Sequence, residues 1–118
     1  MKTLRFNKDF ELDFLILGIN SHIKLYKLCW EINKKLHTSF VKNKNHIINN
    51  NQEFERFSYT NKSSEITYNI ISNISTTGYL EPNNKSVNYF MIVQGEIYNT
   101  QKTIERLTEF NNLISQTK

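Results

Sequence analysis

Few side chains in this sequence could carry out acid–base or nucleophilic chemistry. Among 118 residues there are three histidines and one cysteine. His22 and His37 lie about 22 Å apart along one predicted helix, which rises roughly 1.5 Å per residue, so they cannot bind the same metal ion. No cluster of cysteine, histidine and acidic residues has metal-site spacing, and no glycine-rich phosphate loop occurs. The sequence therefore predicts no catalytic residue, no metal site and no cofactor, which favours a protein that is not an enzyme.

The single cysteine, Cys29, is predicted to be a small buried hydrophobic residue. It cannot form an internal disulfide or half of a CxxC motif, and it falls within the apolar stripe of a predicted helix. Because the N-terminus also lacks an apolar signal segment, we expect a cytoplasmic protein. No apolar run approaches the roughly 18 residues that a membrane span needs, so no span is expected.

The charge distribution suggests an acidic partner, but the composition weakens that interpretation. The net charge is +4, and the excess lies on the first predicted helix and the loop after it. Asparagine occurs 17 times and alanine never, a bias that A/T-rich codons would produce and that would also enrich lysine. Lysines on one helix face are nevertheless able to contact phosphates. The candidate nucleic-acid contacts are Lys24, Lys27, Lys34, Lys35, Lys42 and Lys44.

The element that positions most of these residues is an amphipathic helix over residues 22–37. Its apolar stripe includes Leu28 and Ile32, and its lysines occupy the opposite side. Asn20 or Ser21 is placed to cap its N-terminus. Beside the stripe lies a shoulder of polar-tipped side chains, which is typical of interfaces, although such residues also pack against the fold. The shoulder consists of His22, Tyr26, Trp30 and Asn33.

Alternating apolar residues predict strands and complete the element order β-α-β-β-β-α. The strands lie at about residues 10–17, 53–60, 65–75 and 87–95, with a turn at 18–21, a loop at 42–52 and a second helix from about 99 to 115. We predict a single α+β domain over residues 1–118. It is a two-layer sandwich with a mainly antiparallel sheet of about four strands and two helices on one face. An uncovered second face would present strand aromatics to a partner.

Three segments of the sequence resemble a known family. Residues 21–33 read S-H-I-K-L-Y-K-L-C-W-E-I-N, which is similar to the S-H-x-K-x-Y-x-L-x-W-x-I-N helix of the bacterial IPExxxVDY family. Residues 68–73 are similar to its strand that begins with an aromatic residue, and residues 81–89, E-P-N-N-K-S-V-N-Y, resemble its naming motif. Asn83 and Asn88 replace the two acids of that motif, and asparagine acts neither as a general acid nor as a general base. The family has no established activity, so the resemblance implies interaction more than catalysis.

The sequence leads to three hypotheses on function. The first is a small protein-interaction module without catalytic activity, whose partner is another protein or a second copy of this chain. The second is RNA or ribosome binding through the lysine-rich helix face, and the third is an enzyme of unknown reaction. The residues predicted to bind the protein partner are His22, Tyr26, Trp30, Asn33, Gly78, Pro82 and Tyr89.

Overall fold

The computed structural model describes residues 4–6, 14–48, 52–62 and 65–95, together with the isolated positions 105, 108, 109 and 112. Its elements are β1 (Leu4–Phe6), β2 (Phe14–Ile19), α1 (Leu25–Leu36), β3 (Val41–Lys42), β4 (His46–Ile48), β5 (Gln52–Phe54), β6 (Arg56–Asn61), β7 (Ile66–Ser72), β8 (Ile74–Ser75), β9 (Gly78–Tyr79), the 3-10 helix η1 (Pro82–Asn84) and β10 (Tyr89–Gln94). Six of the strands form an antiparallel sheet in the order β1-β2-β10-β7-β6-β3. The other four form the hairpins β4-β5 and β8-β9.

The predicted α+β class and the mainly antiparallel sheet are confirmed. The expected count of about four strands is wrong, because the short strands β1 and β3 extend the sheet at its two edges. The segment 42–52 is not simply a loop, since it contains β4 and the start of β5. The predicted second helix, at about residues 99–115, lies largely outside the described residues. Four positions within it are described, and all four are helical: 105, 108, 109 and 112.

The predicted turn at residues 18–21 begins too early. Gly18 and Ile19 continue β2, because Gly18 pairs with Phe90 and Ile19 pairs with Tyr89 across the ladder to β10. A strand partner that is distant in sequence therefore overrides the local turn tendency of glycine.

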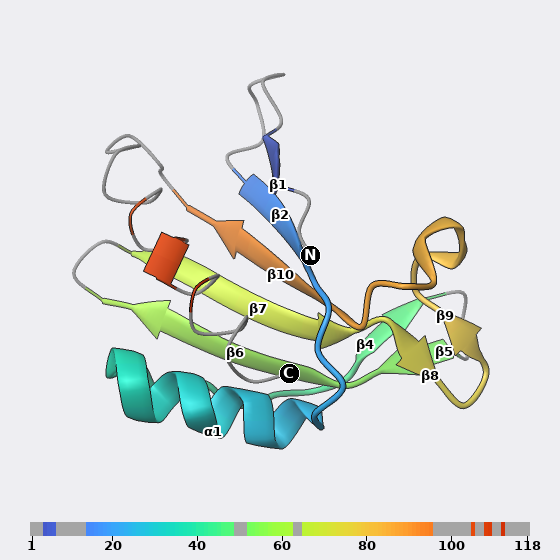
Figure 1. The fold of residues 1–118 in the computed structure, drawn as a ribbon, viewed down its shortest axis with the longest axis horizontal. Helices are drawn as coiled ribbons and strands as arrows, with labels where there is room; N and C mark the ends of the chain where they lie inside the picture. The colour runs from blue at the N-terminus through green and yellow to red at the C-terminus, as the bar shows by residue number, and fades with distance from the viewer. Residues whose placement is uncertain are drawn as a thin grey trace.

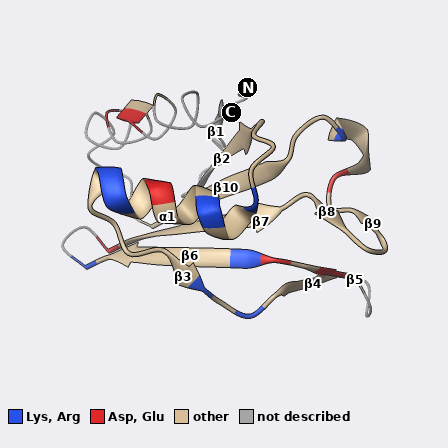
Figure 2. Ribbon diagram, turned by 60° about the horizontal axis from the view of Figure 1, so that its bottom comes forward, with Lys and Arg blue, Asp and Glu red and all other residues tan. Residues whose placement is uncertain are grey.

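Helix α1 covers one face of the sheet and creates the hydrophobic core (Figures 1 and 2). Successive side chains of a strand point to opposite faces, and those that point toward α1 are the buried ones. Ile70 of β7 and Met91 of β10 are fully buried against Leu28 and Ile32 of α1. Each such aliphatic side chain contributes about 1.5–3 kcal/mol to folding when it leaves water. Figure 1 also shows that both hairpins lie together at one end of the sheet.

The start of α1 is fixed by a long-range contact and not by a local cap. We expected Asn20 or Ser21 as the N-cap, but that residue is Lys24, whose side chain makes no capping hydrogen bond. Instead the backbone N of Ser21 donates to Asn88 Oδ1 at 2.8 Å, and the backbone N of Asn88 donates to the carbonyl of Ile19 at 2.9 Å. The segment before β10 is therefore bonded to the chain that leads into α1.

Asn73 holds this segment in place from a fully buried position between β7 and β8. Its Nδ2 donates to the carbonyls of Asn84 at 3.0 Å and Val87 at 2.8 Å. Its Oδ1 accepts from the backbone N of Glu81 at 2.8 Å, and its own backbone N donates to the carbonyl of Asn88 at 2.9 Å. One amide side chain thus satisfies three backbone groups of the chain that leads into β10.

Replacement of this buried amide should be strongly destabilising. Asn73→Ala leaves three backbone groups without their partners, and we expect the free energy of unfolding to fall by about 3 kcal/mol. Urea denaturation followed by circular dichroism measures this. Asn84→Ala is the matched control, because that side chain is exposed and only its backbone oxygen joins the network. It should change stability by less than about 0.5 kcal/mol, and equal effects of the two substitutions would contradict the assignment.

Candidate functional site

Tyr26 and Trp30 form an exposed aromatic surface one turn apart on α1. Their side chains are 61% and 54% exposed, although large aromatic residues are on average well buried. The ammonium nitrogen of Lys34 lies 4.7 Å from the centre of the Trp30 ring, a cation–π contact. His22, before the start of the helix, is exposed as well. We call Tyr26 and Trp30 the aromatic surface of α1; neither ring is part of the core.

Asn33, the fourth residue of the predicted shoulder, is turned toward the fold. Its Oδ1 accepts from Thr38 Oγ1 at 2.8 Å and from the backbone N of Phe40 at 2.7 Å, while its Nδ2 donates to the carbonyl of Phe40 at 3.0 Å. These bonds close the turn after α1, where His37 adopts a left-handed conformation with φ of 56°. The Asn33 amide therefore orients α1 and the chain that follows it.

The other three residues predicted to bind a partner lie away from the aromatic surface of α1. Tyr89 is buried in β10, and its hydroxyl donates to the carbonyl of Ile23, which ties the sheet to the entrance of α1. Gly78 has φ of +145°, a conformation that favours glycine, and an added Cβ would lie 3.2 Å from Gln52 Nε2. Pro82 is exposed at the first position of η1. The backbone N at that position makes no hydrogen bond within a helix, so proline is tolerated there. Tyr89 and Gly78 thus support the fold.

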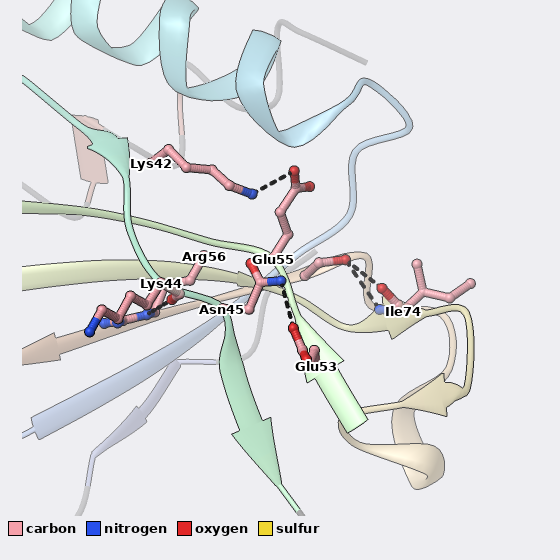
Figure 3. Close-up of polar contacts among 8 residues, drawn as sticks. Lys42, Lys44, Asn45, Glu53, Glu55, Arg56 and Ile74 are labelled. Atoms are coloured by element: carbon pink, nitrogen blue, oxygen red, sulfur yellow. Dashed lines mark hydrogen bonds and ion pairs between the residues drawn. The ribbon is translucent and has the colours of Figure 1, made fainter. Parts of the chain in front are cut away.

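The six candidate lysines fall into two groups. Four are exposed on α1 or directly before it, and Figure 2 shows basic positions along this helix. They are Lys24, which precedes the first residue of α1, and Lys27, Lys34 and Lys35 within it. Lys42 of β3 pairs with Glu55, with 3.0 Å between Nζ and Oε2, as Figure 3 shows. Lys44 follows in the loop, and its carbonyl accepts from Arg56 Nε at 3.0 Å. The charge of Lys42 is therefore partly offset by Glu55.

Cys29 is buried in the apolar stripe, as predicted. Burial raises the pKa of its thiol to about 12, and the charge of Glu55 adds to this effect. At neutral pH the thiol is protonated and is neither a nucleophile nor a metal ligand. In the part of the chain that the structure describes, no group of three or more His, Cys, Asp or Glu side chains could hold a metal ion. Over the same residues, no helix has the length and apolar character to cross a membrane.

A groove on the sheet face opposite α1 was not identified from the sequence. Phe90 and Ile92 of β10 are half-buried in its floor, and Arg56 of β6 lies beside it. The alternation along β10 does separate Phe90 and Ile92 from the core residues of the same strand. What the sequence lacks is any signal for which segments fold over this second face. The hairpin strand β4 and the η1 segment do so here.

Comparisons with protein-family models, with curated proteins and with solved structures found no match to this chain. The resemblance to the IPExxxVDY family stays a prediction that rests on residues 21–33, 68–73 and 81–89. A fold does not specify an activity, so the exposed surfaces of this chain carry the information on its function.

The thiol of Cys29 should be unreactive while the chain is folded. Its pKa of about 12, against 9.0 for an unperturbed thiol, lowers the thiolate fraction at neutral pH roughly a thousandfold. Labelling with iodoacetamide, followed by mass spectrometry, should be slow in buffer and fast in urea. Because the folded-state pKa is raised, this group also removes stability as the pH rises from about 9 toward 12. Rapid labelling of the folded chain, or stability that increases over that pH range in step with Cys29 ionisation, would contradict its buried position.

Proposed function

We propose that this chain is a small protein-interaction module without catalytic activity, which binds another protein in the cytoplasm through the aromatic surface of α1. The exposure of Tyr26 and Trp30 is the observation that carries this proposal. Tyrosine and tryptophan supply most of the binding energy at many protein interfaces, because their large rings are amphipathic and lose little conformational entropy.

The packing of α1 supports this role. The helix is anchored by Leu28, Cys29 and Ile32, which are almost completely buried. The Asn33 amide fixes its C-terminal turn. The two rings therefore project from a rigid support, and a rigid support lowers the entropic cost of binding.

The charge around the aromatic surface indicates the chemistry of the partner. Lys27 and Lys34 are exposed on the same helix, and Lys34 already lies over the Trp30 ring. A partner surface with apolar pockets bordered by carboxylates would complement this arrangement, since complementary charge favours encounter and fixes orientation. The sequence also suggested a second copy of this chain as the partner that binds this surface.

RNA binding is the second candidate, favoured by the four exposed lysines beside two exposed rings on α1. Basic and aromatic side chains together bind single-stranded nucleic acid by phosphate contacts and base stacking. Against it, the charge of Lys42 is partly offset by Glu55, and the ammonium of Lys34 is engaged with Trp30. We therefore rank RNA below a protein partner.

Removal of both rings should abolish partner binding without loss of the fold. The double variant Tyr26→Ala, Trp30→Ala is expected to weaken binding by at least about 30-fold, as for interface hot spots. Its melting temperature should stay close to that of the unmodified chain, because the rings are exposed. Affinity purification from the native cell at low and moderate salt, with proteins and RNA identified, measures the binding.

Lys35→Ala is the matched control on the same helix, because Lys35 is exposed and the cation–π contact with Trp30 is made by Lys34. It should retain the proteins that the double variant loses. Retention of the same proteins by the double variant would contradict the proposal. Loss of the folded-state circular dichroism signal in this variant would contradict it as well. Sedimentation of both forms shows whether the partner is a second copy.

Binding to RNA would have a different signature. If all six candidate lysines contacted phosphates, the affinity for single-stranded RNA should fall roughly 300-fold between about 50 and 200 mM salt. Replacement of Lys24, Lys27 and Lys35 by Gln should reduce that slope. Filter binding or fluorescence anisotropy measures it. Salt-insensitive binding, or no binding at low salt, removes this candidate.

A further inference from the structure

The sheet face opposite α1 carries a groove built from two adjoining hollows of about 680 and 350 Å³. Ile16, Ile92 and His46 line both hollows, so the two lie directly beside each other on this face. These volumes fall within the range of small-molecule sites, and both hollows are partly open to solvent. The larger hollow is bordered by the η1 segment, and the smaller one ends at Arg56.

The strand register makes the floor of the groove apolar. Ile92 of β10 lies opposite Ile16 of β2. Phe90 lies opposite Gly18 on one side and Ile71 on the other. Gly18 contributes no side chain to this floor, and it lines the larger hollow together with Phe90. The side chains of Ile16, Phe90 and Ile92 remain half-buried, which leaves apolar surface for a ligand.

Arg56 places a fixed positive charge at one end of this floor. Its Nη1 donates to Asn69 Oδ1 at 2.9 Å and its Nε to the carbonyl of Lys44 at 3.0 Å. Figure 3 shows Arg56 beside Lys44, while the neighbouring Glu55 extends to Lys42. Within the described residues the guanidinium is therefore held by two neutral acceptors, and no carboxylate pairs with it.

A half-buried guanidinium without a carboxylate is a good site for an anion. Guanidinium N–H groups remain that make neither of these two bonds, and their planar arrangement matches a carboxylate. The two existing hydrogen bonds restrict the side chain in advance, which lowers the entropic cost of binding. At the other end of the groove Glu81 contributes negative charge. An anionic ligand would therefore be oriented with its charged group toward Arg56.

We propose that this groove binds a small organic carboxylate, whose apolar body lies on Ile16, Phe90 and Ile92 and whose carboxylate pairs with Arg56. The site is separate from the aromatic surface of α1, because the groove and α1 lie on opposite faces of the sheet. Ligand binding in this groove does not depend on whether the proposed protein partner is bound.

The test is an NMR titration of the nitrogen-labelled full chain with hydrocinnamate, indoleacetate and isocaproate, each compared with its neutral alcohol. At least one acid should bind saturably and shift the backbone amides of Ile16, Phe90 and Ile92. Its alcohol should bind at least about tenfold more weakly, the loss expected when a charge-assisted hydrogen-bonded pair is missing. Arg56→Gln should lower the affinity for the acid to that for the alcohol and leave the alcohol unaffected.

Several outcomes overturn the proposal: no saturable binding of any acid, equal affinity of acid and alcohol, shifts confined to other residues, or unchanged acid binding by folded Arg56→Gln. The comparison of acid with alcohol uses the unmodified chain, so it remains decisive if that variant does not fold. The Tyr26→Ala, Trp30→Ala variant should bind the acids as well as the unmodified chain does. Failure of this site and failure of the proposed protein interaction are therefore distinguishable.

Discussion

Three backbone groups of the segment before β10 converge on the buried amide of Asn73, and this contact joins the end of β7 to the chain that leads through η1 into β10. An unpaired backbone group in that position would cost about 1–3 kcal/mol, so the amide selects one path for the segment. Along that path Asn88 lies beside the turn that precedes α1, and Tyr89 lies in the core. It also forms one wall of the groove, because η1 lies on the same segment.

The central sheet has two faces with different uses. One face is covered by α1 and forms a buried hydrophobic core that includes Ile70 and Met91. The other carries Phe90 and Ile92 only half-buried, with Arg56 fixed beside them. Period-two alternation along β10 assigns neighbouring residues to these two environments. A single strand therefore contributes both to stability and to the proposed ligand site.

The segment that resembles the IPExxxVDY naming motif has a structural use in this chain. Asn88, at the position of a motif acid, accepts the backbone N–H of Ser21, and Tyr89 donates to the carbonyl of Ile23. Glu81 accepts from the backbone N of Asn83 and so caps η1. These contacts join the sheet to the start of α1. An asparagine oxygen accepts such a bond as an aspartate oxygen does, so replacement of the acid does not remove this contact.

The sequence by itself determined the α+β class, the amphipathic helix, and the burial of Cys29 in its apolar stripe, because these depend on local periodicity and composition. It also located Tyr26 and Trp30 on one shoulder of the helix. Only the tertiary structure decided that both rings are exposed while Asn33, on the same shoulder, is engaged with the fold. The strand character of Gly18, the Asn73 network and the guanidinium of Arg56 likewise depend on partners distant in the chain. Pairing between such distant segments is a property of the packed fold and leaves no periodic signal in one sequence.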